Sequence, residues 1–557
     1  MSEVLTAPVA SLVEARSEER FKSDAEVFTA PVASPVEARL EARLEARLTR
    51  GSAAGFLRVH LVEAREILRL GWPIMIMRVA QFAPKTLMLV VVGKLPDGAA
   101  YLAGAGMGTM FCNVTGTAFI SGSGFGGSSL IAQAFGAGNP ERAGVLLQRQ
   151  LAMHALLMAC AIAPVWLAAE PLLRDVLGQP AETAALAARF ARVRLVALPF
   201  TSLITDLSAF LIAQKVTRLP AAVNLSSSLA QAGLFVLMIR PLGAGPFAFG
   251  FEGAAMAMSL AEVVQALLLL ALTPRVLARS GPLHRLTWPR WREQWRESLR
   301  GWGEMLALGV PSAVMTMSEW LGWECSLFQA GILCGGAASA CLPLQAFPVL
   351  SQTMVVFFML HFGFSIAAGA RVGNALGAGK PADARTTAVA SFVVTGAIAT
   401  AVSLALLVWR REWARLFVDG TSAGATELAD LIADVLPLVA LYVFLDALGP
   451  SWSHQLLFAA AKVKFGAFFN VFCFWAFAQP LGALLAFRLG YGLFGLWAGL
   501  DAGMALLVVG LVSYISSWMS WERAAEEAQR RSKANAASDC HVAHNQIGTS
   551  IHRYRYR

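Results

Sequence analysis

The sequence predicts an all-α polytopic membrane protein with twelve transmembrane helices in two pseudo-symmetric six-helix lobes. Of the 557 residues, 57% are hydrophobic and only 15% are charged, whereas soluble domains are about a quarter charged. About a dozen apolar blocks reach the roughly 20 residues that a helix needs to cross a bilayer. Short motifs also recur at a constant distance along the chain, which indicates a duplicated half.

The chain opens with a segment of low complexity. The sequence from Thr6 to Arg16 recurs almost unchanged from Thr29 to Arg39, and Glu-Ala-Arg-Leu repeats run from Glu37 to Leu48. We expect residues 1–65 to form a solvated cytosolic tail without a specific role. Its acidic residues argue against an organelle transit peptide.

Twelve spans follow this tail, and they group into two lobes. We predict them at about residues 72–93, 100–127, 144–169, 187–212, 219–242, 249–273, 305–333, 338–362, 387–409, 431–458, 465–488 and 492–518. The first six belong to an N-terminal lobe (66–275) and the last six to a C-terminal lobe (304–518). A basic cytosolic tail is expected over 519–557.

The polar connection 276–303 is the longest between spans. Four tryptophans from Trp288 to Trp302 recur there at spacings of three, four and seven residues, and three arginines from Arg292 to Arg300 occupy a different stripe. This pattern predicts an interfacial amphipathic linker, with tryptophans toward the bilayer and arginines toward lipid phosphates. A soluble connector is the alternative.

Basic residues predict the orientation of the chain. With both termini in the cytosol, the cytosolic loops hold more lysine and arginine than the opposite loops, as the positive-inside rule requires. The net charge of +9 then reflects loops facing anionic lipid, so no nucleic-acid partner is expected. We expect an integral protein of the plasma membrane or of a vacuolar or other organelle membrane.

Two motif pairs support the duplication. Gly-Ala-Gly-x-Pro occurs at 136–140, after the second span, and at 377–381, after the eighth. Gly250-Phe-Glu-Gly253 and Gly492-Leu-Phe-Gly495 precede spans six and twelve, and both pairs are displaced by 241 or 242 residues. We expect Gly136 and Gly377 to adopt the left-handed conformation that ends a helix. Such repeats place a substrate site between the halves, near the midplane.

Three further motifs stand out: Gln133-Ala-Phe-Gly-Ala-Gly138, Ala370-Arg-Val-Gly-Asn-Ala-Leu-Gly-Ala-Gly379 and Glu319-Trp320…Glu324. Together they resemble the multidrug and toxic compound extrusion (MATE) family, in its eukaryotic branch. The resemblance covers about residues 66–520 and implies a V-shaped pair of lobes. It further implies export of organic cations or other metabolites in exchange for protons, with Na⁺ as the alternative coupling ion and no cofactor.

The resemblance also assigns residues. Glu319 and Glu324 match the proton- and cation-binding motif of span seven, and Asp446 matches an acid in span ten. The family's motif loops map to Gln133, Gly136, Gly138, Arg371, Asn374, Gly377 and Gly379. The chain departs from the family pattern at Gly93-Lys94-Leu95-Pro96 and over 459–466.

The two glutamates of span seven are five residues apart, which turns a helix by about 140°. Trp323 therefore shares a face with Glu319, and Trp320 with Glu324. A carboxylate beside an indole can bind an organic cation through charge and cation–π attraction. The alternative is that the two glutamates only make polar contacts between helices. We expect one glutamate in the substrate cavity and the other inside the lobe, near Asp446.

Other polar residues in apolar spans are further candidates, because charged groups are costly in a bilayer. The substrate cavity is expected to include Trp320, Trp323, Gln81 and His454. In the N-terminal lobe, we hypothesise that Lys85 pairs with Asp206 or Glu262. Structural roles remain open for these residues and for Asp501.

Several classes of function are disfavoured. The seven cysteines include no C-x-x-C and the eight histidines show no zinc spacing, so no metal is expected. No hydrolase or kinase motif is present, so an enzyme is not expected.

The sequence thus predicts a monomeric, proton-coupled antiporter for a small-molecule substrate, working by alternating access. Protonation of Glu319, Glu324 and Asp446 would compete with substrate. The alternatives are an organic-anion (citrate-like) exporter of the same family, a lipid or oligosaccharide flippase, and an intramembrane enzyme or receptor. Whether Lys85 and Arg78 line the central cavity discriminates among the transported classes.

Overall fold

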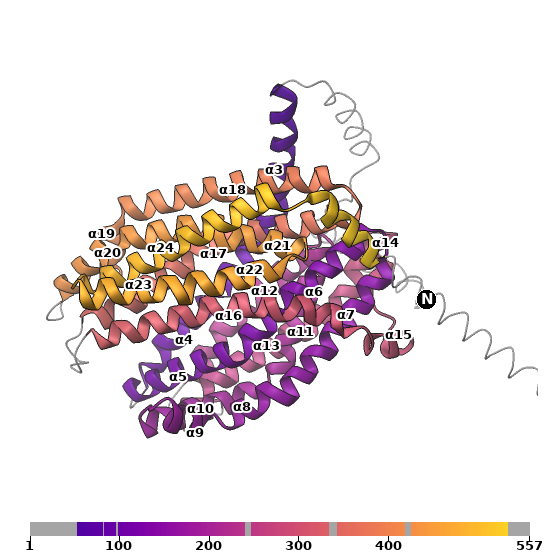
Figure 1. The fold of residues 1–557 in the computed structure, drawn as a ribbon. Coiled ribbons are helices and arrows are strands. Elements are labelled where there is room, and N and C mark those ends of the chain that lie inside the picture. The colour runs from indigo at the N-terminus through magenta and orange to yellow at the C-terminus, as the bar shows by residue number, and fades with distance from the viewer. Residues whose placement is uncertain are drawn as a thin grey trace, which may run out of the picture.

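The computed structural model of the protein describes residues 53–81, 83–95, 98–239, 247–333, 342–417 and 425–532. Every regular element in these ranges is helical. The helices form two bundles that lie side by side, one from each half of the chain (Figure 1).

Six membrane-crossing segments make up the N-terminal lobe. They are α3 (Ala53–Ala80) with α4 (Ala83–Val92), α5 (Gly98–Cys112) with α6 (Ala118–Gly136), α7 (Pro140–Leu157) with α8 (Ala163–Leu167), α10 (Ala181–Leu195) with α11 (Leu198–Ala213), α12 (Arg218–Met238) and α13 (Glu252–Ser280). The short α9 (Ala169–Pro171) follows α8. Single π-helical turns, such as Asn113–Thr117 between α5 and α6, join some of these pieces.

The linker carries α14 (Pro282–Thr287) and α15 (Trp291–Ser298). The C-terminal lobe then comprises α16 (Trp302–Ile332), α17 (Leu342–Gly377), α18 (Pro381–Val408) with the short α19 (Arg410–Arg415), α20 (Ala425–Asp446) with α21 (Gln455–Ala459), α22 (Val463–Val471) with α23 (Gln479–Ala483), and α24 (Gly492–Ser513). Residues 521–532 form a final helical segment.

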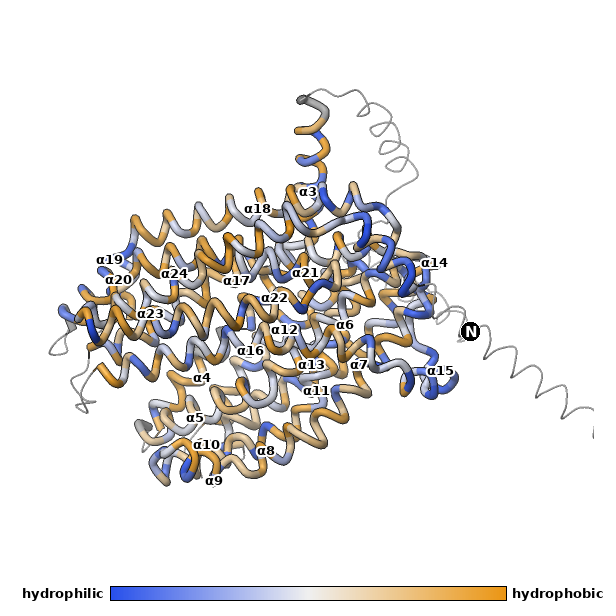
Figure 2. Tube along the Cα trace, in the orientation of Figure 1, coloured by the Kyte–Doolittle hydropathy of each residue, from blue (hydrophilic) through white to orange (hydrophobic). Residues whose placement is uncertain are grey.

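The twelve predicted spans can therefore be followed in the described residues. Eight of these helices are long and apolar enough to cross a membrane by composition alone, and α10 with α11, bent by 58°, makes a ninth. The other three are α3 with α4, the glycine-rich α5–α6, and α16, which carries both glutamates. Apolar residues run along both bundles, and hydrophilic residues gather near α14 and α15 (Figure 2).

A break in the tenth span positions several candidate residues. Between α20 and α21 lies a π-helical stretch, Ala447–His454, in which Gly449 leaves the helical region with φ −84° and ψ −109°. Pro450 follows directly and lacks the N–H that a regular helix would use. Asp446, just before this stretch, and His454, its last residue, are both buried.

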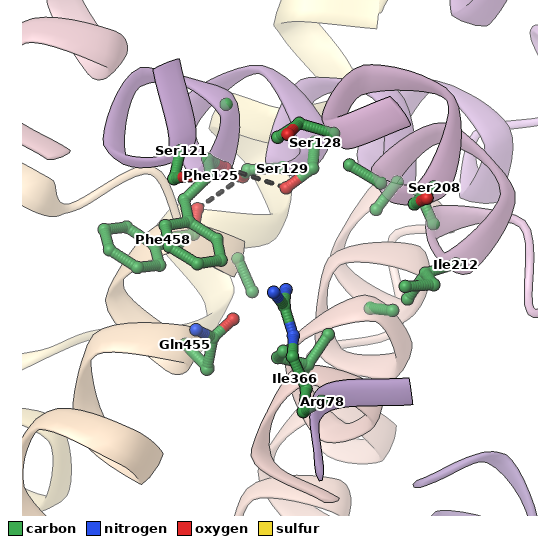
Figure 3. Close-up of a pocket in the computed structure, with 18 of the residues that line it drawn as sticks. Arg78, Ser121, Phe125, Ser128, Ser129, Ser208, Ile212, Ile366, Gln455 and Phe458 are labelled. Atoms are coloured by element: carbon green, nitrogen blue, oxygen red, sulfur yellow. Dashed lines mark hydrogen bonds between the residues drawn. The ribbon is translucent and has the colours of Figure 1, made fainter. Parts of the chain in front are cut away.

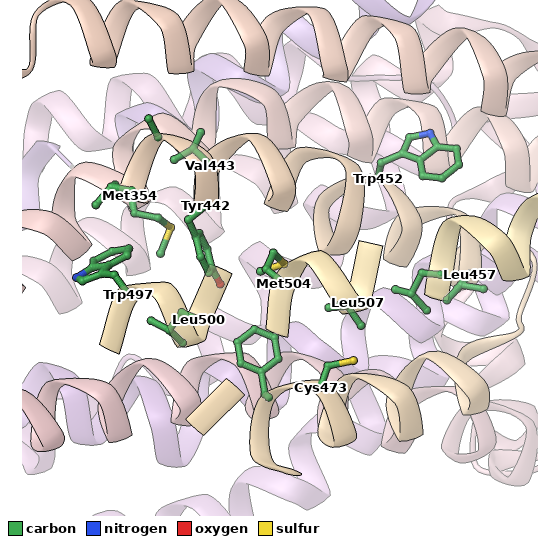
Figure 4. Close-up of a cluster of buried hydrophobic side chains, with 14 of the residues drawn as sticks. Met354, Tyr442, Val443, Trp452, Leu457, Cys473, Trp497, Leu500, Met504 and Leu507 are labelled. Atoms are coloured by element: carbon green, nitrogen blue, oxygen red, sulfur yellow. The ribbon is translucent and has the colours of Figure 1, made fainter. Parts of the chain in front are cut away.

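The C-terminal lobe has one large apolar core. Tyr442 and Trp497 are almost fully buried and pack with Met354, Leu500 and Met504 between α17, α20 and α24 (Figure 4). The buried residues of the N-terminal lobe fall into smaller clusters, one of which also contains Met305, Leu308 and Phe458 of the C-terminal lobe. Burial of this kind holds each bundle together internally, because close packing is the main source of helix association in lipid.

The lobes meet chiefly where α6 packs against α16 and α17, and where α3 packs against α17 and α18. Gly136, the last residue of α6, lies so close to α17 that a Cβ there would overlap the carbonyl oxygen of Asn374. Gly377 makes the equivalent approach to the carbonyl oxygen of Gln133. These two glycines therefore allow the ends of α6 and α17 to touch.

This arrangement corrects one sequence prediction. Gly136 and Gly377 do not adopt the left-handed conformation; Gly138 (φ +74°) and Gly379 (φ +71°) do. The helices end at Gly136 and Gly377, and the left-handed turn two residues later directs the chain into the next helix. Small size, rather than backbone freedom, is what the structure requires at Gly136 and Gly377.

The linker and the tail differ in part from the expected pattern. Trp291 and Trp295 are exposed, as an interfacial helix requires, whereas Trp288 and Trp302 pack against the N-terminal lobe. The helix α3 begins at Ala53, inside the segment predicted to be a tail. Residues 1–50, with their repeats, lie outside the described residues, and the division into domains remains a proposal.

Candidate functional site

Glu319 lies on α16 inside the C-terminal lobe. Its Oε1 accepts a hydrogen bond of 2.9 Å from Asn470 Nδ2, and His454 Nδ1 lies 3.5 Å from the same oxygen. The amide nitrogen of Asn470 is also 3.5 Å from His454 Nε2. Three spans, seven, ten and eleven, thus contribute to one polar contact in an apolar bundle.

Asp446 lies next to this contact, within electrostatic range of Glu319. Ser451 Oγ donates a 2.7 Å hydrogen bond to Asp446 Oδ2, across the break in the tenth span. His361 Nε2, from α17, is 3.8 Å from the same oxygen, and both ring nitrogens of this buried histidine lack hydrogen-bond partners in the described part of the chain. We call Glu319, Asp446, His361, His454 and Asn470 the acid–histidine cluster.

Glu324 does not join the acid–histidine cluster. It is half-buried on α16, and no hydrogen bond or ion pair to it is present among the described residues. Its predicted neighbour Trp320 is 39% exposed on the surface of the bundle. Trp323 instead packs in the lobe core, with ring centroids 4.9 Å from Tyr442 and 5.3 Å from Trp497.

Asp501, on α24, is a further acid in this lobe. Only 5% of its surface is exposed, and both carboxyl oxygens are buried without a hydrogen-bond partner among the described residues. Tyr442 lies within electrostatic range of Asp501, Asp446 and Glu319.

Asp206 in the N-terminal lobe belongs to a separate network. Its Oδ1 accepts a 2.7 Å hydrogen bond from Gln150 Nε2, and its Oδ2 lies 2.9 Å from His154 Nδ1 and 3.2 Å from Ser202 Oγ. The other ring nitrogen of His154 is 2.9 Å from Ser123 Oγ. A serine, a histidine and an aspartate hydrogen-bonded in series can catalyse hydrolysis. Here all three side chains are buried inside the protein, and Ser123 packs against Gly309 of α16.

Glu262 has other partners as well. Arg194 donates a 2.7 Å hydrogen bond to its Oε1, and Thr201 Oγ donates one of 2.5 Å to its Oε2. Lys85 lies in α4, but its side chain is outside the described residues. Its pairing with Asp206 or Glu262 thus stays a prediction, although the oxygens of both acids already have partners.

A cavity of about 120 Å³ lies between the lobes. Its lining comes from both halves of the chain: Arg78 and Gln81 from the first span, Ser121, Phe125 and Ser128 from α6, Thr205 and Ser208 from α11, and Gln455 and Phe458 from α21, among others. Figure 3 shows the guanidinium of Arg78 pointing into this space, which Gln455 also lines. Of the residues predicted for the substrate cavity, Gln81 lines this space, whereas His454 lies in the acid–histidine cluster.

The family motif residues lie on helix ends rather than in loops, except Gly138 and Gly379. Gln133 Nε2 donates a 2.7 Å hydrogen bond to the carbonyl oxygen of Ala459, at the end of α21. Asn374 Nδ2 donates one of 2.8 Å to that of Ala213, at the end of α11. Each acceptor is the last residue of the second helix in a broken span, Ala459 in α21 and Ala213 in α11. The two halves of the chain are therefore joined by a pair of equivalent hydrogen bonds.

Arg371, also on α17, binds Glu63 of α3 through two hydrogen bonds. Burial raises the pKa of the Glu63 carboxyl, but the hydrogen bonds and charge of Arg371 and the Thr387 hydroxyl more than offset this. The pKa of Glu63 consequently lies below its ordinary range. Glu63 precedes the first predicted span. This ion pair therefore connects the N-terminal part of α3 to the other lobe.

Sequence reasoning missed several site residues. His361, His154 and Asn470 all lie in the interior of apolar spans, and a polar residue in such a position was the available signal. Arg194 and Gln150 also lie within predicted spans, but other polar residues surround them in α10 and α7, so neither residue stood out. Among the described residues, no group of three histidine, cysteine, aspartate or glutamate side chains is arranged so that it could hold a metal ion.

Comparisons with known proteins agree with the duplicated fold. A family model described as MatE matches residues 73–237 and 311–484, one segment in each lobe. Multidrug and toxin extrusion protein 1 of Homo sapiens is 28% identical over 487 residues, which cover 86% of this chain and 79% of that protein. Protein DETOXIFICATION 16 of Arabidopsis thaliana is 27% identical over 481 residues, covering 85% and 92%.

A solved structure shares the fold. The crystal structure of the eukaryotic MATE transporter AtDTX14 superposes with a TM-score of 0.75 at 23% identity, covering 85% of this chain and all of that chain. Its helices form the same two lobes, which agrees with the twelve segments followed above.

Proposed function

The chain belongs to the MatE family of multidrug and toxic compound extrusion transporters, and from this premise we propose that it exports an organic solute in exchange for protons. It is an integral membrane transporter and not an enzyme, because its relatives are transporters. The proposed solutes are organic cations, xenobiotics or metabolites, and the alternatives are organic anions or, for a flippase, lipids or oligosaccharides. Transport would proceed by alternating access between the two lobes.

The observation that supports proton coupling best is the acid–histidine cluster. Two acids from different spans, Glu319 and Asp446, share an apolar interior with His361 and His454. Ionisable residues inside a membrane bundle mark proton or ion pathways by default. A proton added to Glu319 would remove the charge to which Asn470 and His454 are directed, and so change the packing of spans seven, ten and eleven.

A short path connects this cluster to the cavity between the lobes. His454 approaches Glu319, while the next residue, Gln455, lines the cavity. The carbonyl oxygens of Phe458 and Ala459, in the same short helix, accept hydrogen bonds from Ser129 and Gln133 of α6. A change at Glu319 can therefore reach both the cavity and the contact between lobes through α21.

Alternating access requires that the lobes separate at one end while they close at the other. Gly136 and Gly377 bring α6 and α17 into backbone contact at the end that carries the Gly-Ala-Gly turns. We propose that this end faces the cytosol, with both termini on the same side. The contact would then be the inner gate in its closed state.

The test is a pH-jump efflux assay in proteoliposomes with Glu319→Gln. We expect substrate efflux driven by an imposed proton gradient to be lost, because glutamine cannot take up a proton. Exchange of labelled for unlabelled substrate at equal pH should persist, since it needs no proton. Unchanged gradient-driven efflux in this variant would overturn the role of Glu319.

The matched control is Glu182→Gln. Glu182 is exposed at the start of α10, so the same change of charge there should leave both assays unaltered. Asp446→Asn should behave as Glu319→Gln if both acids form one proton site. Replacing the proton gradient with a sodium gradient distinguishes H⁺ from Na⁺ coupling.

The membrane that holds the protein and its monomeric state are part of the same proposal. We propose the plasma membrane or a vacuolar or other organelle membrane, and a transporter that works as a single chain. Neither nucleic acid nor a cofactor has a role in this scheme.

A further inference from the structure

We propose that the cavity between the lobes binds an anionic group, so that the transported solute is an aromatic organic acid rather than an organic cation. This inference rests on the proposed transport function and specifies its substrate class. It starts from Arg78, which is charged under all physiological conditions and whose guanidinium points into the cavity (Figure 3).

Arg78 has no acidic partner in the part of the chain that the structure describes. No ion pair or hydrogen bond to it is present there, and its Nε is buried without a partner. Its one close interaction is with the ring of Phe362, 5.7 Å from the guanidinium carbon. An aromatic face attracts a cation but does not neutralise it, so the charge of Arg78 remains uncompensated.

Among the described residues, the cavity lining contains no aspartate or glutamate. Two buried or half-buried acids of the N-terminal lobe already have partners: Asp206 with Gln150 and His154, and Glu262 with Arg194 and Thr201. A cation entering the cavity would therefore meet a fixed positive charge without an opposing carboxylate. An anion would supply the charge that this site lacks.

Polar groups around Arg78 suit the oxygens of an anion. Gln455, which is 6% exposed and whose amide has no hydrogen-bond partner among the described residues, lines the same cavity as Arg78 (Figure 3). The hydroxyls of Ser121 and Ser208 also line the cavity without a partner in the described ranges. An arginine with nearby amide and hydroxyl donors can bind a carboxylate or sulfonate through several charge-assisted hydrogen bonds.

The apolar part of the lining specifies the rest of the ligand. Phe125 and Phe458, one from each half of the chain, stack with their ring centroids 5.2 Å apart and their planes within 4°. Both line the cavity (Figure 3). A flat aromatic body attached to the anionic group would extend this stack, because offset aromatic pairs attract at such distances.

The test measures binding to the purified protein in detergent, where proton coupling plays no part. Three probes share one ring system and differ in charge: naphthalene-1-sulfonate, 1-naphthylmethanol and 1-naphthylmethylammonium. Isothermal titration should give the sulfonate the lowest Kd, with the ammonium at least about tenfold weaker, as one charged hydrogen bond would predict. Tighter binding of the ammonium, or failure of all three to bind, would overturn the inference.

Arg78→Gln should weaken sulfonate binding by about tenfold or more. It should also bring the Kd values of the three probes closer together. Arg58→Gln is the matched control, since Arg58 is an exposed arginine on the same helix. Without ligand, Arg78→Gln should melt at the same or a higher temperature, because it removes an uncompensated charge. A lower melting temperature together with unchanged sulfonate binding would show that Arg78 serves packing only.

The two proposals fail separately. If no assay shows proton-driven efflux while sulfonate binding depends on Arg78, the proposal of proton coupling is refuted. The proposal that the cavity binds an aromatic organic acid would then still stand. Proton-driven efflux of the naphthylmethylammonium but not of the sulfonate would refute the substrate class and leave the coupling.

Discussion

Arg371 donates two hydrogen bonds of 2.6 Å to the carboxylate of Glu63, from Nε to Oε1 and from one Nη to Oε2. Thr387 of α18 donates a third, also 2.6 Å, to Oε1. A two-point arginine–carboxylate pair of this kind fixes orientation as well as distance. It joins α3, which begins the N-terminal half, to α17 and α18 of the other lobe.

Replacing Glu63 should therefore lower the free energy of unfolding by an amount that depends on pH. Glu63→Gln removes the charge that Arg371 and Thr387 contact, and we expect a loss of about 2 kcal/mol at neutral pH, as for hydrogen bonds to charged groups. Because the folded pKa of Glu63 is lowered, its contribution is fully present above the unfolded value of about 4.3. It is lost as the pH falls through the lower folded pKa.

Thermal unfolding of the detergent-solubilised protein between pH 7 and pH 3 measures this effect. The difference in melting temperature between wild type and Glu63→Gln should be largest near neutral pH and shrink in acid. Glu66→Gln is the control, because Glu66 is exposed and contacts only Arg69 at 3.4 Å in the described structure. A difference that grows as the pH falls would contradict the assignment.

The contact between Gly136 and Gly377 yields a second prediction. A methyl group at either position would overlap the backbone of the opposite helix, so Gly136→Ala and Gly377→Ala should prevent α6 and α17 from closing. We expect transport to fall at least tenfold while expression and folding persist, because the lobes themselves are not altered. Gly106→Ala is the control, since a Cβ there meets nothing within 4 Å.

The accessibility of a cysteine placed on α6 near Gly136 would report closure directly. Labelling by a water-soluble maleimide should increase in the two alanine variants and stay unchanged in Gly106→Ala. Normal transport by Gly377→Ala would show that this contact is not a gate.

The duplication and the twelve spans were predictable because they depend on local composition. The lobes themselves follow from apolar blocks and from motifs displaced by a constant distance, which need no knowledge of packing. The predicted second and eighth spans ended too early, near residues 127 and 362, because hydropathy falls there. The helices α6 and α17 continue to Gly136 and Gly377, since their polar side chains bind the opposite lobe instead of water.

The partners of the site residues could not be predicted in this way. That Glu319 meets His454 and Asn470 depends on how spans seven, ten and eleven pack, and on the break at Gly449. The sequence placed Trp323 beside Glu319 on one helical face, but its ring packs into the aromatic core around Tyr442. Helical spacing defines a face, whereas packing decides what that face meets.

Asp206 provides a third prediction. Its two oxygens accept or approach polar groups from Gln150, His154 and Ser202, and it is almost fully buried. Asp206→Leu should destabilise the protein by about 3–5 kcal/mol, because removal of one member of a buried pair strands its partners. Asp206→Asn should cost less, since the amide oxygen can still accept a hydrogen bond.

Thermal unfolding with the double variant Asp206→Leu/His154→Leu completes the test. If the two residues stabilise the fold as a pair, the double variant should be less destabilised than the sum of the single variants. Strict additivity would show that Asp206 and His154 act independently.

Asp501 should respond in the opposite way to Asp206. Both of its oxygens are buried and neither has a partner in the part of the chain that the structure describes. A buried polar group without a hydrogen bond is costly, so Asp501→Asn removes a charge without breaking a contact. We expect the melting temperature of Asp501→Asn to equal or exceed that of the wild type, whereas that of Asp206→Asn should be lower.

If Asp501→Asn also lowers the melting temperature at neutral pH, its carboxyl must have a partner that stabilises the lobe, such as a bound cation. Repeating the measurement with sodium replaced by a large organic cation would then identify whether sodium is that partner.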